Sequence, residues 1–129
     1  MDESHPEPLI TRLVPILYVR DLNAERSFYE TLGFTVTYEG TEYPEFIAIG
    51  CGSVEFGLER REDFDGAQAP QVLIWQLGVS SVDAAAAVCQ QAGIACAIET
   101  HEPGENWRYR TLRLRSPNGF EVLLEGPRE

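Results

Sequence analysis

Two stretches of the chain, sixty residues apart, share one pattern, and this repeat limits the possible folds more than any other feature. Residues 19–24 read VRDLNA and residues 79–84 read VSSVDA. Asp21 precedes Gly33 by twelve residues, and Ser81 precedes Gly93 by the same number. A strand, a helix and a strand that starts after glycine are therefore expected twice. Repetition at a fixed spacing indicates two copies of one supersecondary unit and places a shared site between them.

The segments around each copy extend the repeat to a βαβββ module. In the first half, Pro15 cannot donate a ladder hydrogen bond, so it marks a strand start, an edge or a bulge within Leu13–Val19. Asp21 or Asn23 can cap the helix that Gly33 ends. Three strands follow, at Thr35–Tyr38, Phe46–Ile49 and Val54–Leu58. The second half repeats the order with Val72–Val79, a helix at Val82–Ala92, and strands at Ile94–Glu99, Arg108–Arg115 and Phe120–Leu124.

The length and composition predict one domain over residues 1–129, of the α+β class. Module one covers about 10–60, a polar linker about 61–70, and module two about 71–126. The net charge of −11 argues against nucleic acid and anionic lipid as partners. No apolar run is long enough to span a membrane and the start lacks a signal-peptide pattern, so a cytoplasmic protein is expected. The three cysteines have no C-x-x-C spacing and predict neither a disulfide framework nor a zinc site.

Several short motifs, taken in order, resemble those of the vicinal oxygen chelate superfamily, which includes glyoxalase I, extradiol dioxygenases, and fosfomycin- and bleomycin-resistance proteins. They are VRDL at 19–22, SFY at 27–29, LGF at 32–34 and SPNGF at 116–120. The resemblance covers almost the whole chain. It implies two tandem βαβββ modules that form a cupped, half-open sheet, with the helices outside and a ligand cleft inside.

Catalytic members of that superfamily hold a divalent metal with His and Glu side chains from the first and fourth strands of each module. The motif spacing carries three of these positions onto Val14, Ile74 and Leu123, whose side chains cannot ligate a cation. The fourth falls on Glu55 in one alignment and on Gly57 in another. The only histidines are His5 in the N-terminal tail and His101 in an expected loop over Thr100–Asn106, both read as exposed. We therefore expect no metal, no cofactor and no catalytic residue.

The stretches VPIL at 14–17 and ENWRYR at 105–110 most resemble motifs of the bleomycin-resistance proteins, which are acidic, metal-free homodimers that sequester a cationic antibiotic. Trp107 follows GEN at 104–106, where the alternatives are an exposed aromatic that stacks on a ligand and a partly buried loop anchor. Trp75, Phe28 and Tyr29 are assigned to the core. Strand alternation and this resemblance assign the following residues to a small-molecule site: Tyr18, Phe46, Glu55, Gln76, Trp107, Tyr109, Arg113 and Glu121.

Two points stay open at the level of sequence. A cleft-facing Arg113 favours an anion unless Glu121 or Glu55 pairs with it, so the charge of the ligand is unsettled. The alternative to a binding protein is a glyoxalase- or dioxygenase-like enzyme in which Glu55 is a base or the one remaining metal ligand. A structural or regulatory domain that uses the cup for protein contact is a third interpretation.

Overall fold

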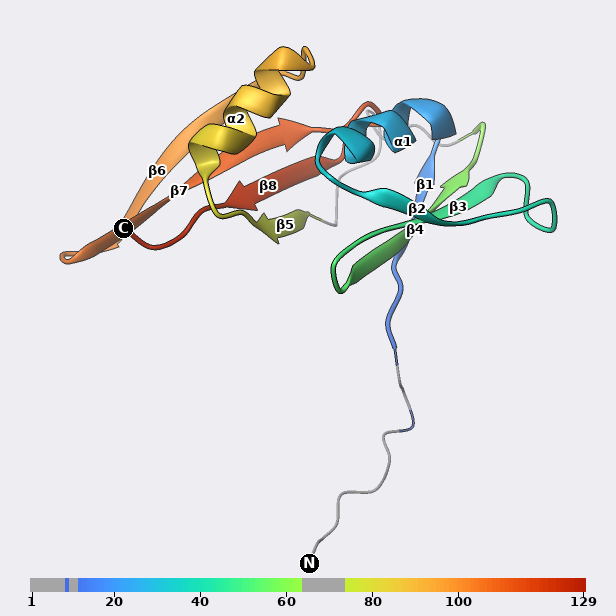
Figure 1. The fold of residues 1–129 in the computed structure, drawn as a ribbon, viewed down its shortest axis with the longest axis horizontal. Helices are drawn as coiled ribbons and strands as arrows, with labels where there is room; N and C mark the ends of the chain where they lie inside the picture. Colours follow the sequence, from blue (N-terminus) through green and yellow to red (C-terminus); the bar gives the residue numbers. More distant parts are fainter. Residues whose placement is uncertain (1–8, 10–11, 64–73) are drawn as a thin grey trace, which may run out of the picture.

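The computed structural model describes residue 9 and residues 12–63 and 74–129, and it contains the two βαβββ modules in tandem (Figure 1). Module one holds a four-stranded sheet and one helix, and module two repeats them. The elements of module one are β1 (Ile16–Val19), α1 (Leu22–Thr31), β2 (Thr35–Glu39), β3 (Phe46–Cys51) and β4 (Val54–Arg60). Those of module two are β5 (Trp75–Gly78), α2 (Val82–Gln91), β6 (Cys96–Gly104), β7 (Trp107–Arg115) and β8 (Glu121–Glu125). The predicted fold class is confirmed.

Both sheets have the same strand order. It is β1-β4-β3-β2 in the first, here called sheet A, and β5-β8-β7-β6 in the second, sheet B. The first strand of each module runs parallel to the last, and the remaining pairs are antiparallel. Each helix lies over one face of its sheet, and the face away from the helix is called here the open face (Figure 1).

The helices begin and end where the sequence predicts. Asp21 caps α1 and Ser81 caps α2, each accepting a hydrogen bond at 3.0 Å from the backbone N–H three residues on. Gly33 and Gly93, just past the helix ends, have φ of 103° and 75°, a conformation that other residues rarely adopt. The repeated spacing from cap to glycine therefore sets the length of both helices.

One hydrophobic cluster includes residues from both modules. Phe28 and Tyr29 of α1 are buried against Phe56 of β4, with Tyr29 and Phe56 ring centres 5.0 Å apart. Trp75 of β5 packs on Phe56 from the second module, at 4.7 Å between centroids. The prediction that Phe28, Tyr29 and Trp75 belong to the core is confirmed, and the Phe56–Trp75 contact joins the two halves.

Some predicted boundaries of strands and loops differ from those in the structure. Strand β1 starts at Ile16, directly after Pro15, which agrees with the predicted effect of the proline. The expected loop over 100–106 is wrong, because β6 continues to Gly104 and β7 begins at Trp107, leaving a tight hairpin. Most of the expected linker and the start of the Val72–Val79 strand lie outside the described residues. Among the helices of the described residues, none is long and apolar enough to cross a membrane.

Candidate functional site

The predicted site residues fall into two groups, one on the open face of each sheet. Side chains alternate along each strand, so Phe56 and Leu58 point to the core while Glu55 and Gly57 point away from α1. The sheet A group consists of Tyr18, Phe46 and Glu55. The sheet B group consists of Gln76, Trp107, Tyr109, Arg113 and Glu121. Within these groups, the structure places Trp107 in contact with Tyr109 and Arg113 in contact with Glu121, and the others share only a sheet face.

The open face of sheet A is dominated by the ring of Phe46, which covers Gly57. A Cβ atom at Gly57 would lie 2.5 Å from Cε2 of Phe46, so only glycine leaves room for the ring. Glu55 accepts a hydrogen bond from the Thr37 hydroxyl at 2.7 Å and pairs with Arg12 at 3.4 Å. These contacts give Glu55 an ordinary structural role and give no specific support to its use as a base.

A row of stacked rings runs along the open face of sheet B. His101 of β6 lies opposite Tyr109 of β7, and their ring centres are 4.8 Å apart with planes 25° from parallel. Tyr109 is stacked in turn with Trp107, at 5.6 Å and 18°. The imidazole Nε2 of His101 is 2.9 Å from Oγ1 of Thr111, so the reading of His101 as an exposed loop residue is wrong. We call these three side chains the aromatic row.

A cation of the chain itself lies over the ring of Trp107. The guanidinium carbon of Arg128 lies 4.7 Å from the centre of the Trp107 ring, a cation–π contact. Backbone hydrogen bonds between Glu129 and Arg108 hold this segment beside β7, the shorter being 2.7 Å. Trp107 is half-buried, and a cavity of about 320 Å³ around it is also lined by Glu102, Gly104, Glu105, Asn106, Arg108 and Glu129.

Arg113 is held between two carboxylates. It donates to Glu99 across the strand pair at 3.1 and 3.2 Å and forms an ion pair with Glu121. Hydrogen bonding from Arg113 lowers the pKa of Glu99 below its usual value. Because two negative groups pair with one positive group, the trio carries a net charge of about −1 at neutral pH. The condition that the sequence left open for Arg113, a pairing with Glu121 or Glu55, is met by Glu121.

Strand register decides where the fourth metal position of the superfamily falls. Ile16 lies opposite Gly57 in the first sheet, and Gln76, sixty residues later, lies opposite Leu123 in the second. Gly57 is thus the structural equivalent of Leu123, and Glu55 is not. The donor set at these four positions consists of Val14, Gly57, Ile74 and Leu123, none of which has a ligating side chain. In the described parts of the chain, no three His, Cys, Asp or Glu side chains come together as metal ligands.

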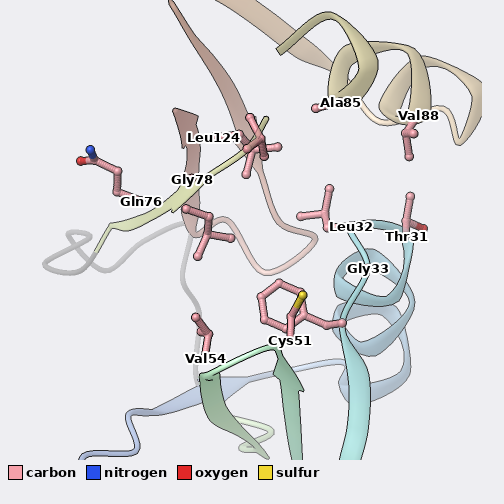
Figure 2. Close-up of a pocket in the computed structure, with 13 residues that line it drawn as sticks. Thr31, Leu32, Gly33, Cys51, Val54, Gln76, Gly78, Ala85, Val88 and Leu124 are labelled. Atoms are coloured by element: carbon pink, nitrogen blue, oxygen red, sulfur yellow. The ribbon is translucent and has the colours of Figure 1, made fainter. Parts of the chain in front are cut away.

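A separate pocket opens between the two modules (Figure 2). Its volume is about 420 Å³, within the usual range for small-molecule sites. No charged residue lines it, although the chain carries 31 acidic and basic residues. Its walls come from the end of α1, the β3–β4 turn, β5, α2 and β8: Thr31, Leu32, Gly33, Phe34, Cys51, Val54, Gln76, Leu77, Gly78, Val79, Ala85, Val88 and Leu124. Of the predicted site residues, Gln76 alone is among them, so the pocket and the open face of sheet B meet at Gln76.

The family assignment comes from the sequence itself. Residues 10–124 match the family model described as the Glyoxalase/Bleomycin resistance protein/Dioxygenase superfamily. The chain belongs to this superfamily. No curated protein sequence gives a significant match to this chain.

Solved structures of several other proteins have the same fold. A bleomycin-binding protein complexed with bleomycin has a TM-score of 0.64 and 19% identity, with 92% of this chain and 99% of that chain covered. The bleomycin resistance determinant encoded on the transposon Tn5 gives 0.65 and 19%, with 91% and 98% covered. TnmS3, an antibiotic-binding protein from Streptomyces sp. CB03234, gives 0.61 and 23%, with 94% and 99% covered. At these identities the likeness establishes the fold.

Proposed function

We propose that the chain is a metal-free receptor that sequesters a small molecule carrying a planar cationic group, and that it does so as a homodimer. The observation that carries this proposal is the Arg128 guanidinium on the ring of Trp107. A guanidinium is flat, positive and weakly hydrated. Its position on Trp107 therefore indicates which kind of ligand group the aromatic row can bind. A ligand would take the place of Arg128.

The charges around the aromatic row favour a cation over an anion. Glu102, Glu105 and Glu129 line the cavity beside Trp107 together with one basic residue, Arg108, and Glu129 pairs with Arg108 and Arg110. The lining keeps an acidic excess through Glu102 and Glu105, and the trio at Arg113 is net negative. The overall charge of −11 adds a long-range attraction that speeds the capture of a positive ligand. Stacking on an aromatic ring contributes about 0.5 to 1.5 kcal/mol per pair beyond area burial.

The neutral pocket between the modules suits an uncharged part of the same ligand. Gln76 belongs both to the pocket and to the open face of sheet B, and it hydrogen-bonds Glu125. A molecule with an apolar body and a cationic ring could therefore use both regions. The structural neighbours described as binding bleomycin or an antibiotic support a binding role of this kind.

The homodimer is proposed because the predicted site is divided. Tyr18, Phe46 and Glu55 lie on sheet A, whereas the aromatic row lies on sheet B. If the open face of sheet A from one copy met that of sheet B from a second, the two groups would enclose one cleft. Sedimentation equilibrium tests this part: a molecular mass of twice 14.4 kDa is expected, and a monomer at micromolar concentration would contradict it.

Titration calorimetry with a matched pair of tricyclic compounds tests the ligand class. Proflavine is planar and cationic, and acridone has a similar shape without the charge. We expect proflavine to bind more tightly, and we expect Trp107→Ala to remove most of that preference. Bleomycin serves as a third probe. Equal affinity for the two tricyclic compounds, or an unchanged affinity in Trp107→Ala, would refute the proposed role of the aromatic row.

A further inference from the structure

We infer that Glu25 is a proton-dependent latch between the two modules: in its neutral form it holds the β7–β8 turn of module two against the start of α1 in module one. The latch lies at the joint between the modules, and no ligand is needed for it. Glu25 lies in the first turn of α1 with 0% of its surface exposed, although Glu side chains are almost never fully buried without a partner.

The contacts of Glu25 cross from one module to the other. Its Oε1 atom accepts a hydrogen bond from the backbone N–H of Asn118 in the β7–β8 turn, and Ser116 of the same turn donates to the carboxyl group. The side chain of Asn118 completes the joint. It accepts from the Arg20 N–H at 3.0 Å and donates to the Tyr18 carbonyl at 3.3 Å. These contacts hold residues 116–118 on the corner between β1 and α1.

Two further buried polar side chains lie near Glu25, and the Trp75 N–H hydrogen-bonds the Tyr29 hydroxyl. Among the described residues, the Oε2 atom of Glu25 has no hydrogen-bond partner. Tyr29 is one turn further along α1, and Trp75 comes from β5 of module two. The Tyr29 hydroxyl can accept from a protonated Glu25 or donate to its carboxylate, and the Trp75 N–H is a donor only, so these two groups fit either form of Glu25. A preference for the neutral acid therefore has to come from the burial of the carboxyl group without a cation beside it.

The groups around Glu25 offer little compensation for a negative charge. From α1 and its cap, the facing titratable groups are Tyr29 and Asp21, and the charge of Asp21 has the same sign. The β7–β8 turn contributes Ser116 and Asn118, and β5 contributes Trp75, all of them uncharged. Burial raises the pKa of Glu25 to about 7, against the opposing effect of the Asn118 and Ser116 hydrogen bonds. An ionised Glu25 gains hydration when the turn moves away, so ionisation favours opening.

Amide hydrogen exchange measures this opening directly. The N–H groups of Asn118 and Arg20 are the two backbone donors inside the latch. Between the ordinary carboxyl pKa of 4.5 and the raised value of about 7, the protection of both amides, corrected for intrinsic exchange, should fall about tenfold per pH unit. Above that range it should level off.

In Glu25→Gln, the glutamine side chain has nearly the same shape and can both donate and accept hydrogen bonds, but it cannot ionise. The protection of the Asn118 and Arg20 amides in this variant should therefore not change with pH. Glu30→Gln removes a half-exposed charge from the same helix and should behave like the wild type. The inference would be overturned if amide protection in the wild type did not change with pH, or if it changed in the same way in Glu25→Gln. Carbon NMR titration of the Glu25 carboxyl in the unmodified chain needs no variant: a midpoint near 7 is expected, and one near 4.5 would also overturn it.

Discussion

Phe46 lies so close over Gly57 that the open face of sheet A has no space for a side chain there. The superfamily places a metal-binding carboxylate at the equivalent position, and here an aromatic ring fills it. Gly57 and Phe46 therefore form one structural feature, in which the absence of a side chain at Gly57 on β4 leaves room for the Phe46 ring on β3. Two substitutions at glycine positions test this relationship.

Gly57→Ala should lower the free energy of unfolding by about 1 to 3 kcal/mol, because the added methyl group forces the Phe46 ring to move. The matched control is Gly78→Ala on β5, where an added Cβ meets no atom within 4 Å. That change should be close to neutral. Urea unfolding of both variants measures the difference. If Gly57→Ala and Gly78→Ala were equally stable, the Phe46 ring would be able to move without a loss of folding free energy.

Replacing Arg113 with Gln should raise the pKa of Glu99, because the hydrogen bonds from Arg113 are the largest cause of its present depression. The variant also removes the ion pair of Arg113 with Glu121, whose side chain is 17% exposed. We expect a loss of stability of roughly 1 to 3 kcal/mol, mainly from Glu121. NMR titration of the Glu99 carboxyl against the wild type measures the first effect. An unchanged pKa of Glu99 would contradict the assignment of this pair.

The pKa of Glu25 predicts how stability depends on pH. A carboxyl group whose pKa is raised on folding binds its proton more tightly in the folded state, so its stabilising effect is fully present below pH 4.5. The effect is lost as the pH rises to about 7, and the difference between the two pKa values corresponds to roughly 3 kcal/mol. Urea unfolding from pH 4.5 to 8 should show this loss in the wild type relative to Glu25→Gln. A constant difference between the two proteins would contradict it.

The sequence predicted the order of elements well because the signals involved are local. Asp21 and Ser81 cap helices through their own side chains, and Gly33 and Gly93 end them through their own backbone conformation. Strand alternation also placed Tyr109, Arg113 and Glu55 on the faces where they lie. These inferences needed no contact between distant residues.

The parts that the sequence missed depend on long-range contacts. In the sequence, Glu25 looks like an ordinary acidic residue in the first turn of a helix. Its burial depends on Asn118, which packs against it although it is ninety-three residues away in sequence. His101 lies in a strand because β7 pairs with it, although its neighbours in sequence suggested a loop. Arg128 reaches Trp107 only once residues 126–129 lie beside β7. One sequence signal could have placed His101 in a strand: the alternation of side chains along β6, continued to the residue opposite Tyr109.

Arg128→Ala should increase the affinity for proflavine, because a bound planar cation no longer has to displace the guanidinium from Trp107. A cation–π contact at a partly exposed site contributes about 0.5 to 1 kcal/mol, which predicts an affinity increase of about two- to fivefold. Arg26→Ala removes a positive charge from α1, where Arg26 pairs with Glu30 and Glu39, and controls for the change in overall charge. That control should alter proflavine binding by less than Arg128→Ala, as measured by titration calorimetry at 0.15 M salt, where the Debye length of about 8 Å screens distant charges. If Arg128→Ala instead weakens binding, the guanidinium helps to build the site and does not compete for it.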